Sequence, residues 1–154
     1  MADRTLQGTG DPILASVQVP GDKSLSHRAL ILAAIAEGDS VVTGLGPGED
    51  VASTVRALSQ LGVAMKGDEI RSPGIKGWHT PETPVDCGNS GTTMRLLAGA
   101  LSTSSVRAEL IGDASLTQRP MERLAVPLRA LGGIFATSTN GTSPLQVGGA
   151  EGPV

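Results

Sequence analysis

Residues 24–36 read S-L-S-H-R-A-L-I-L-A-A-I-A, a mostly apolar run behind a polar start. This pattern is typical of a buried helix that begins near a serine. Residues 90–102 read S-G-T-T-M-R-L-L-A-G-A-L-S and have the same character. A shift of 66 positions, from 24 to 90, aligns Leu30 with Leu96 and Ile35 with Leu101. The chain therefore contains an internal repeat.

Both copies continue in the same way, with a strand, a second helix that stops at a glycine, and two further strands. The expected segments are Ser40–Leu45, Asp50–Leu61, Val63–Lys66 and Glu69–Arg71 in the first copy, and Val106–Ile111, Pro120–Leu131, Ile134–Ser138 and Leu145–Val147 in the second, with glycine stops at Gly62 and Gly132. The unit is helix, strand, helix, strand, strand, and its period is near 66 to 70. The predicted fold class is α/β with duplicated subdomains, and the alternative is a chance resemblance of two ordinary α/β stretches.

The chain outside the repeats is short. Alternating apolar residues predict one strand over Ile13–Val19, and Pro20-Gly21 then reads as a hinge. We therefore divide the chain into residues 1–20, the first strand and hinge, and residues 21–154, the two copies at about 21–85 and 86–154. The final V-G-G-A-E-G-P-V follows a strand signal without a closing helix, so we expect a truncated domain.

Composition limits the possible functions. The 154 residues are 39% hydrophobic and 18% charged, which predicts one globular domain or a piece of one. Twelve basic and 15 acidic side chains give a net charge of −3, which argues against nucleic-acid and anionic-membrane partners. Cys87 is the single cysteine, so an internal disulfide framework and a cysteine metal cluster of the usual ligand count are excluded, and two separated histidines make a poor metal site. Without a signal sequence or long apolar run, we expect a cytoplasmic protein.

The start of the first helix has the features of an anion site. Residues 20–28 read P-G-D-K-S-L-S-H-R, which places Lys23, Ser24 and Arg28 around the helix N-terminus after a glycine turn. Free N–H groups, the helix dipole and two cations all favour an anion there. The alternative is an ordinary capped and solvated helix start.

The second copy offers a related site. Residues 86–95 read D-C-G-N-S-G-T-T-M-R, in which Asn89, Ser90 and Thr92 can hydrogen-bond and Gly91 allows close approach of a ligand. The alternative is a glycine-rich N-cap. Arg119 precedes Pro120, a favoured first helical residue, so we expect its guanidinium at a third helix start. If these helix starts converge, they form a pocket for a phosphate or carboxylate ligand.

Other chemistry-bearing residues give weaker signals. His27 has adjacent serines, but neighbours on a helix do not face one another, which disfavours a catalytic triad. His79 and Cys87 read as packing or loop residues. Glu49 and Asp50 suit the positive end of their helix, and a role in the pocket is left open.

The strings P-G-D-K-S-L-S-H-R-A, G-N-S-G-T-T-M-R and G-D-A-S-L-T-Q-R-P-M closely resemble the 5-enolpyruvylshikimate-3-phosphate (EPSP) synthase family. The last string looks most like the bacterial class II members. The related UDP-N-acetylglucosamine enolpyruvyl transferases typically have asparagine after the lysine and a reactive cysteine loop, whereas Ser24 follows Lys23 here. The resemblance implies that the repeats form part of an inside-out α/β barrel.

The resemblance also implies an activity. Family members transfer the enolpyruvyl group of phosphoenolpyruvate to the 5-hydroxyl of shikimate 3-phosphate and release phosphate, in aromatic amino acid biosynthesis, without a cofactor or metal. By motif, Lys23 contacts both substrates, while Ser24 and Arg28 hold shikimate 3-phosphate. Gly91 lines the phosphoenolpyruvate site with Asn89 and Thr92 beside it, and Arg119 clamps the phosphoenolpyruvate anion. Gly91 also implies room for the inhibitor glyphosate.

The family pattern is longer than this chain. Its members have two domains of three repeats each, with the active site between them, whereas this chain matches an initial strand of the other domain and two of the three repeats. We therefore expect the chain to need a complementary C-terminal fragment for catalysis. The alternative is a stand-alone module that binds an anion without chemistry.

Overall fold

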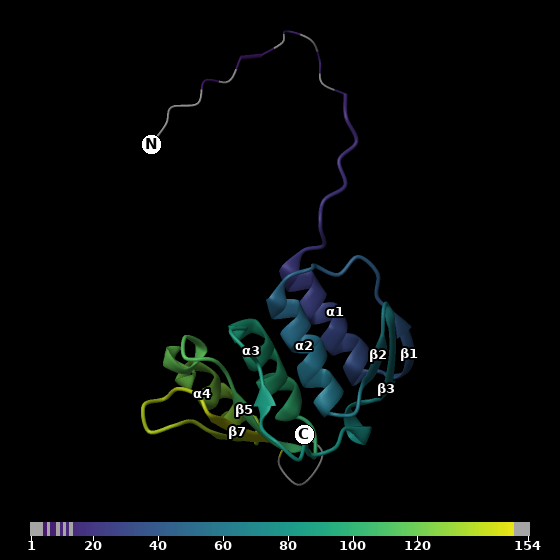
Figure 1. Ribbon diagram of the computed structural model, residues 1–154. Helices are drawn as coiled ribbons and strands as arrows, with labels where there is room; N and C mark the ends of the chain where they lie inside the picture. The colour runs from purple at the N-terminus through teal and green to yellow at the C-terminus, as the bar shows by residue number, and fades with distance from the viewer. Residues whose placement is uncertain (1–4, 6, 9, 11, 13, 150–154) are drawn as a thin grey trace.

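A computed structural model describes residues 5, 7, 8, 10, 12 and 14–149 (Figure 1). The repeated pattern of the sequence appears as alternating helices and strands. In chain order these are α1 (Lys23–Ile35), β1 (Glu37–Val41), α2 (Glu49–Gln60), β2 (Ala64–Lys66), β3 (Glu69–Pro73), the 3₁₀ turn η1 (Ile75–Gly77), β4 (Val85–Asp86), α3 (Gly91–Leu101), β5 (Arg107–Ile111), the 3₁₀ turn η2 (Leu116–Gln118), α4 (Glu122–Ala130), β6 (Ile134–Ala136) and β7 (Leu145–Gly148).

The sheets confirm the duplication. In the first copy the strand order is β1-β3-β2, and in the second copy β5-β7-β6 has the same order, with antiparallel neighbours in both. The second sheet carries one more strand, β4, which pairs parallel to the outer side of β5. Equal strand order in both halves confirms an α/β fold of duplicated helix, strand, helix, strand, strand units.

A glycine contact is also repeated. The loop after β1 passes so close to the turn before α1 that a Cβ on Gly46 would lie 2.9 Å from the carbonyl oxygen of Gly21. In the second copy, a Cβ on Gly112 would lie 2.9 Å from the carbonyl oxygen of Gly88. Only glycine permits these backbone approaches without a shift. The same packing therefore fixes the turn that starts the first helix of each copy.

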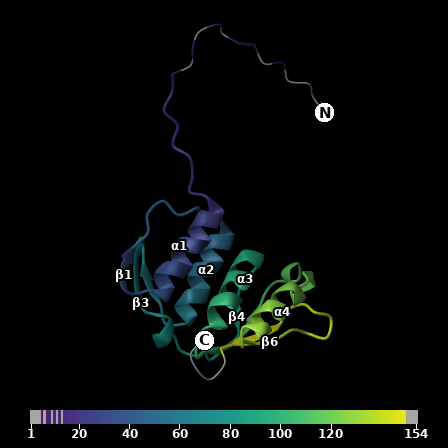
Figure 2. The same cartoon turned by 180° about the vertical axis from the view of Figure 1, so that it is seen from behind.

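The core lies between the helices and the two sheets. Helices α1, α2 and α3 pack side by side, with the β1–β3 sheet beyond α1 and the second sheet beyond α3 (Figures 1 and 2). Aliphatic side chains such as Leu30, Leu58 and Leu97 fill the interior, as the near absence of aromatic residues predicts. At the far end of α1, the indole Nε1 of Trp78 donates to the carbonyl of Ala34 at 3.0 Å. Trp78 is thus a packing residue that also satisfies a helix-end carbonyl.

Several boundaries differ from the sequence predictions. The strand predicted over Ser40–Leu45 forms at Glu37–Val41, because these mostly exposed residues pair with β3 from Glu69 to Pro73. Helix α4 begins at Glu122 rather than Pro120, and β4 and both 3₁₀ turns were not predicted.

The strand predicted over Ile13–Val19 is not formed in the described part of the chain. Residues 14–20 belong to no strand and run away from the helices, with Leu14 94% and Val17 77% exposed. Backbone groups form a strand only with a neighbour to pair with, and the described residues supply none here. Ile13 lies outside the described residues.

Among the described residues, no helix has the length and apolar character needed to cross a bilayer.

Candidate functional site

The first turn of α1 presents a cation beside free backbone N–H groups. Asp22, rather than a serine, caps this helix, and its Oδ1 accepts from the backbone N–H of Leu25 at 2.8 Å. Lys23 and Ser24 follow in the first turn and are exposed. The Arg28 guanidinium donates to the carbonyl of Ser24 at 3.0 Å, on the exposed surface of the same helix.

Lys23 joins α1 to α2. Its Nζ lies 3.0 Å from Oδ2 of Asp50, which is in the first turn of α2. Side-chain exposures of 59% and 33% make this a surface pair, whose contribution to stability is small. The sequence left open whether Glu49 or Asp50 has a role in the predicted pocket. The contact with Lys23 puts Asp50 beside that pocket, whereas Glu49 pairs with Arg56 at 2.5 Å. An anion near Lys23 would compete with Asp50 for the ammonium group.

The first turn of α3 is buried and formed by small residues. Ser90 caps the helix, since its Oγ accepts from the backbone N–H of Thr93 at 3.1 Å. Gly91 is buried, and a Cβ on it would lie 2.5 Å from Nη1 of Arg95 and 3.0 Å from Nη1 of Arg119. Two guanidinium groups therefore face the helix N-terminus at the point where Gly91 lacks a side chain. Two cations at a helix N-terminus suit an anion.

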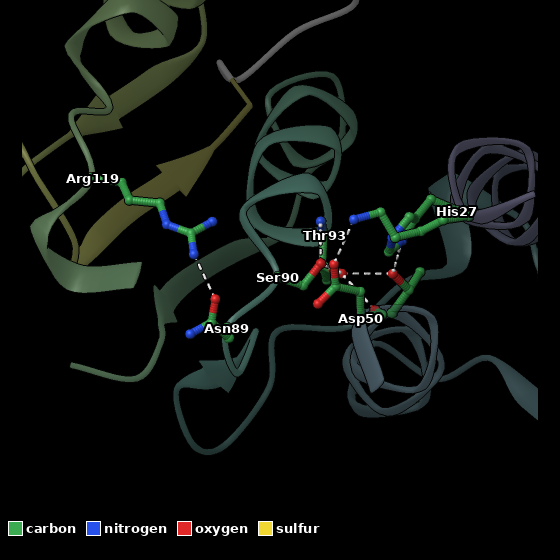
Figure 3. A network of polar contacts seen from close by, with 8 residues as sticks. His27, Asp50, Asn89, Ser90, Thr93 and Arg119 are labelled. Atoms are coloured by element: carbon green, nitrogen blue, oxygen red, sulfur yellow. Dashed lines mark hydrogen bonds and ion pairs between the residues drawn. The ribbon is translucent and has the colours of Figure 1, made fainter. Parts of the chain in front are cut away.

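Arg119 is held by a chain of polar contacts. Its Nη2 donates to Oδ1 of Asn89 at 2.5 Å (Figure 3). Nδ2 of Asn89 donates in turn to Oδ2 of Asp113 at 2.7 Å. The backbone N–H of Leu116 donates to the other oxygen of Asp113 at 2.8 Å. That bond and the one from Asn89 hold the pKa of Asp113 below its usual range. Asp113 therefore stays ionised and orients the amide that orients Arg119.

The expectation that Arg119 begins a helix is wrong. Arg119 ends the 3₁₀ turn η2 and has extended backbone angles, φ −79° and ψ 132°. The residue before a proline is disfavoured in the helical region, so α4 starts only after Met121. The third helix N-terminus at the site belongs to α2, which brings Asp50.

We call Lys23, Asp50, Asn89, Gly91, Arg95 and Arg119 the helix-end site. Convergence of the starts of α1 and α3 is confirmed, because α2 links them through Asp50: Lys23 pairs with its carboxylate, and Thr93 Oγ1 donates to its carbonyl at 3.3 Å (Figure 3). Thr92 lies half-buried in the same turn as Gly91. Ser24 and Arg28 stay on the α1 surface, without a described contact to the groups around Gly91.

Sequence reasoning missed Arg95 and Asp113. Arg95 follows Gly91 by four residues, so helical periodicity places both on one face, and that spacing could have revealed it. Asp113 lies in G-D-A-S, where an aspartate accepting from the N–H groups two and three residues later is a common turn. Its contact with Asn89 spans 24 residues and has no local signal.

Comparison with known proteins identifies the family of this chain. The family model described as EPSP synthase (3-phosphoshikimate 1-carboxyvinyltransferase) matches residues 8–154. The chain belongs to the EPSP synthase family. A member named 3-phosphoshikimate 1-carboxyvinyltransferase, from Acidithiobacillus ferrooxidans, is 46% identical over 151 residues, which are 95% of this chain and 35% of that relative. A member of the same name from Xanthomonas campestris is 43% identical over 147 residues, 92% of this chain and 34% of the relative.

Solved structures agree on the fold. An EPSP synthase from Acinetobacter baumannii is 44% identical, superposes with a TM-score of 0.80, and is matched over 87% of this chain and 32% of its own chain. The resemblance drawn from three sequence strings is therefore confirmed. This chain spans about a third of the length of the EPSP synthase family members it matches.

Proposed function

We propose that this chain supplies the N-terminal part of an enolpyruvyl transferase, which moves the enolpyruvyl group of phosphoenolpyruvate to the 5-hydroxyl of shikimate 3-phosphate and releases phosphate. The observation that carries the proposal is the pair of guanidinium groups, Arg95 and Arg119, facing the bare Gly91 at the start of α3. The named activity of the relatives fits this site, because both substrates are anions. The compartment we propose is the cytoplasm, and we propose no cofactor and no metal.

The roles of the site residues follow from charge and position. Two polyanions repel one another, so fixed cations must hold them together, and the same cations stabilise charge that develops in a tetrahedral intermediate. Arg119, oriented through Asn89, clamps the phosphoenolpyruvate anion beside Gly91 and Thr92. Lys23 contacts both substrates near the reacting carbon. Ser24 and Arg28 hold shikimate 3-phosphate along α1.

Glyphosate would occupy the space beside Gly91 as an inhibitor. It is a small anion carrying a phosphonate and a carboxylate, and it suits the same guanidinium groups as phosphoenolpyruvate. Beyond these small molecules, the partner we propose is a complementary C-terminal segment of the same enzyme. Residues 1–20 would join that other part, and residues 21–154 would form two of three repeats.

Phosphate release from phosphoenolpyruvate and shikimate 3-phosphate tests the proposal. The chain is assayed alone and then mixed with the remaining two thirds of the Acidithiobacillus relative, supplied as a separate protein. Turnover in the mixture alone is the expected result. Turnover by this chain alone would contradict the need for a second part.

The pair of guanidinium groups at Gly91 also fits a second function, since two cations beside a helix N-terminus can hold an anion without further chemistry. The chain could bind shikimate 3-phosphate as a module without chemistry. Calorimetric binding to the chain alone, with no turnover in the mixture, would favour that function over the transferase.

A further inference from the structure

A buried polar network crosses the three packed helices beneath the helix-end site. It consists of His27 on α1, Thr54 on α2, and Thr93 and Ser90 at the start of α3, all at most 1% exposed (Figure 3). His27 Nδ1 lies 2.7 Å from Thr54 Oγ1, which lies 2.7 Å from Thr93 Oγ1, which lies 2.8 Å from Ser90 Oγ. We call these four residues the interior network.

The distances alone allow two orders of hydrogen bonds, because each hydroxyl can donate or accept and the role of Nδ1 depends on the tautomer of His27. In one order the protons run toward His27, and Nδ1 accepts from Thr54. In the other order Nδ1 carries a proton and donates to Thr54, Thr54 donates to Thr93, and Thr93 donates to Ser90 Oγ at 2.8 Å or to the Asp50 carbonyl at 3.3 Å.

The other imidazole nitrogen supports this order. Nε2 of His27 is buried and has no hydrogen-bond partner among the described residues. A buried N–H without an acceptor is rarer and costlier than a buried acceptor without a donor. Nε2 is therefore the unprotonated nitrogen. Burial also lowers the pKa of His27, which keeps the ring neutral.

We infer that the interior network is a positioning device, in which His27, Thr54 and Thr93 hold the start of α3 in place against α1 and α2 so that the helix-end site can bind its anion. The inference rests on the proposed function for the identity of that anion. Ser90 caps the turn that contains Gly91, and Thr93 contacts the carbonyl of Asp50, the partner of Lys23. The network therefore links, through the interior, the side of the site that carries Lys23 and Asp50 to the turn that contains Gly91.

Thr54→Val in the full chain tests the inference, since it keeps the shape and removes the hydroxyl. We expect the Kd for phosphoenolpyruvate to rise about five- to tenfold, with Thr54→Ser restoring the wild-type value. The matched control is Ser72→Ala, which removes a buried hydroxyl that donates to the carbonyl of Ala34. Ala34 lies about 16 Å along α1 from Lys23, so this control should lose stability and keep its affinity.

A second measurement needs no ligand. Nitrogen-15 NMR of His27 should show a protonated Nδ1 and an unprotonated Nε2, and this preference should be lost in Thr54→Val. The amide signals of Gly91 and Thr92 should shift in Thr54→Val and stay unchanged in Ser72→Ala.

The outcomes separate the inference from the proposed function. Unchanged affinity in Thr54→Val, equal loss of affinity in Ser72→Ala, or a protonated Nε2 would each overturn the positioning role. If the wild-type chain alone binds no phosphoenolpyruvate, turnover in the mixture still tests the proposed function, and the NMR results decide whether the network fixes the start of α3.

Discussion

Gly91 shows how one missing side chain shapes the helix-end site. Both guanidinium groups reach the volume that a Cβ would fill, and neither can stay there if a methyl group is added. Its position was predictable from the sequence, because a glycine directly after a capping serine is visible as a motif. The spacing of four residues could also have placed the guanidinium group of Arg95 beside it, but local spacing could not place that of Arg119, which comes from 28 residues farther along the chain.

Gly91→Ala should weaken phosphoenolpyruvate and glyphosate binding roughly tenfold, because Arg95 and Arg119 must move away from the new methyl group. Stability should be kept, as alanine suits a helix better than glycine. The matched control is Gly99→Ala in the same helix, where a Cβ meets no atom within 4 Å. Calorimetric titration of both variants is the measurement, and equal affinities in the two would contradict the geometry.

Cys87 is the other residue with a clear expectation. Burial raises the pKa of its thiol to about 12, and the Asp86 carboxylate adds to that effect. Because the thiolate is the reactive form, a disulfide reagent at pH 8 should modify the native chain about a hundredfold or more slowly than the urea-unfolded chain. Absorbance of the released thiol follows both reactions. Comparable rates would show that Cys87 is accessible, contrary to its burial.

At the scale of elements, helices were predicted better than strands. The apolar spacing in α1 and α3 and the left-handed glycines Gly62 and Gly132 gave helix positions within about two residues. Strand β1 reads E-G-D-S-V and has no apolar alternation, since it lies exposed and depends on pairing with β3. Strand β4 has two residues and exists through its contact with β5. Pairing partners far along the chain leave no local pattern.

The cap of α1 gives a test at this scale. Asp22→Ala removes the acceptor for the Leu25 N–H and should lower the free energy of unfolding by about 1 kcal/mol. Asp22→Asn keeps an acceptor oxygen and serves as the control, which should stay within a few tenths of the wild-type value. Urea denaturation compares the three proteins. If both variants lose the same stability, the charge of Asp22 matters rather than its cap.

For the whole molecule, His27 couples stability to pH. Burial lowers its pKa, the carboxylate of Asp50 opposes this shift, and the cations Lys23 and Arg28 add to it. In the unfolded chain the imidazole takes up a proton as the pH falls through about 6.5, whereas the folded chain still resists protonation. The unfolded state then binds more protons, so this residue destabilises the fold as the pH falls.

Urea denaturation between pH 8 and pH 5 measures the effect. His27 should contribute a loss of up to about 1.4 kcal/mol per pH unit below pH 6.5, until its folded pKa is reached. His27→Gln should remove this contribution from the slope, and His79→Gln, at an exposed histidine, is the control that keeps it. A His27→Gln slope equal to that of the wild type would show that His27 is not the coupled group.

The site as a whole was only half predictable. The three sequence motifs predicted the family and the cations Lys23 and Arg119. The interior network was hidden, because Thr54 and Thr93 resemble any helical threonine until α1, α2 and α3 are packed together. Likewise, the pairing of Lys23 with Asp50 depends on how α2 docks, which the separate helix patterns do not encode.

The extra strand β4 has a consequence for the first sheet. Strand β5 has β4 along its outer side, but β1, its counterpart, has no such neighbour among residues 14–149. An open edge of this kind invites another chain to extend the sheet. Antiparallel joining of two copies centred on Asp39 would set two Asp39–Arg71 ion pairs side by side, because Arg71 on β3 donates to both carboxylate oxygens of Asp39, at 2.7 and 3.1 Å. The central carboxylate of the edge is therefore already neutralised within its own sheet, and its charge does not repel an added strand.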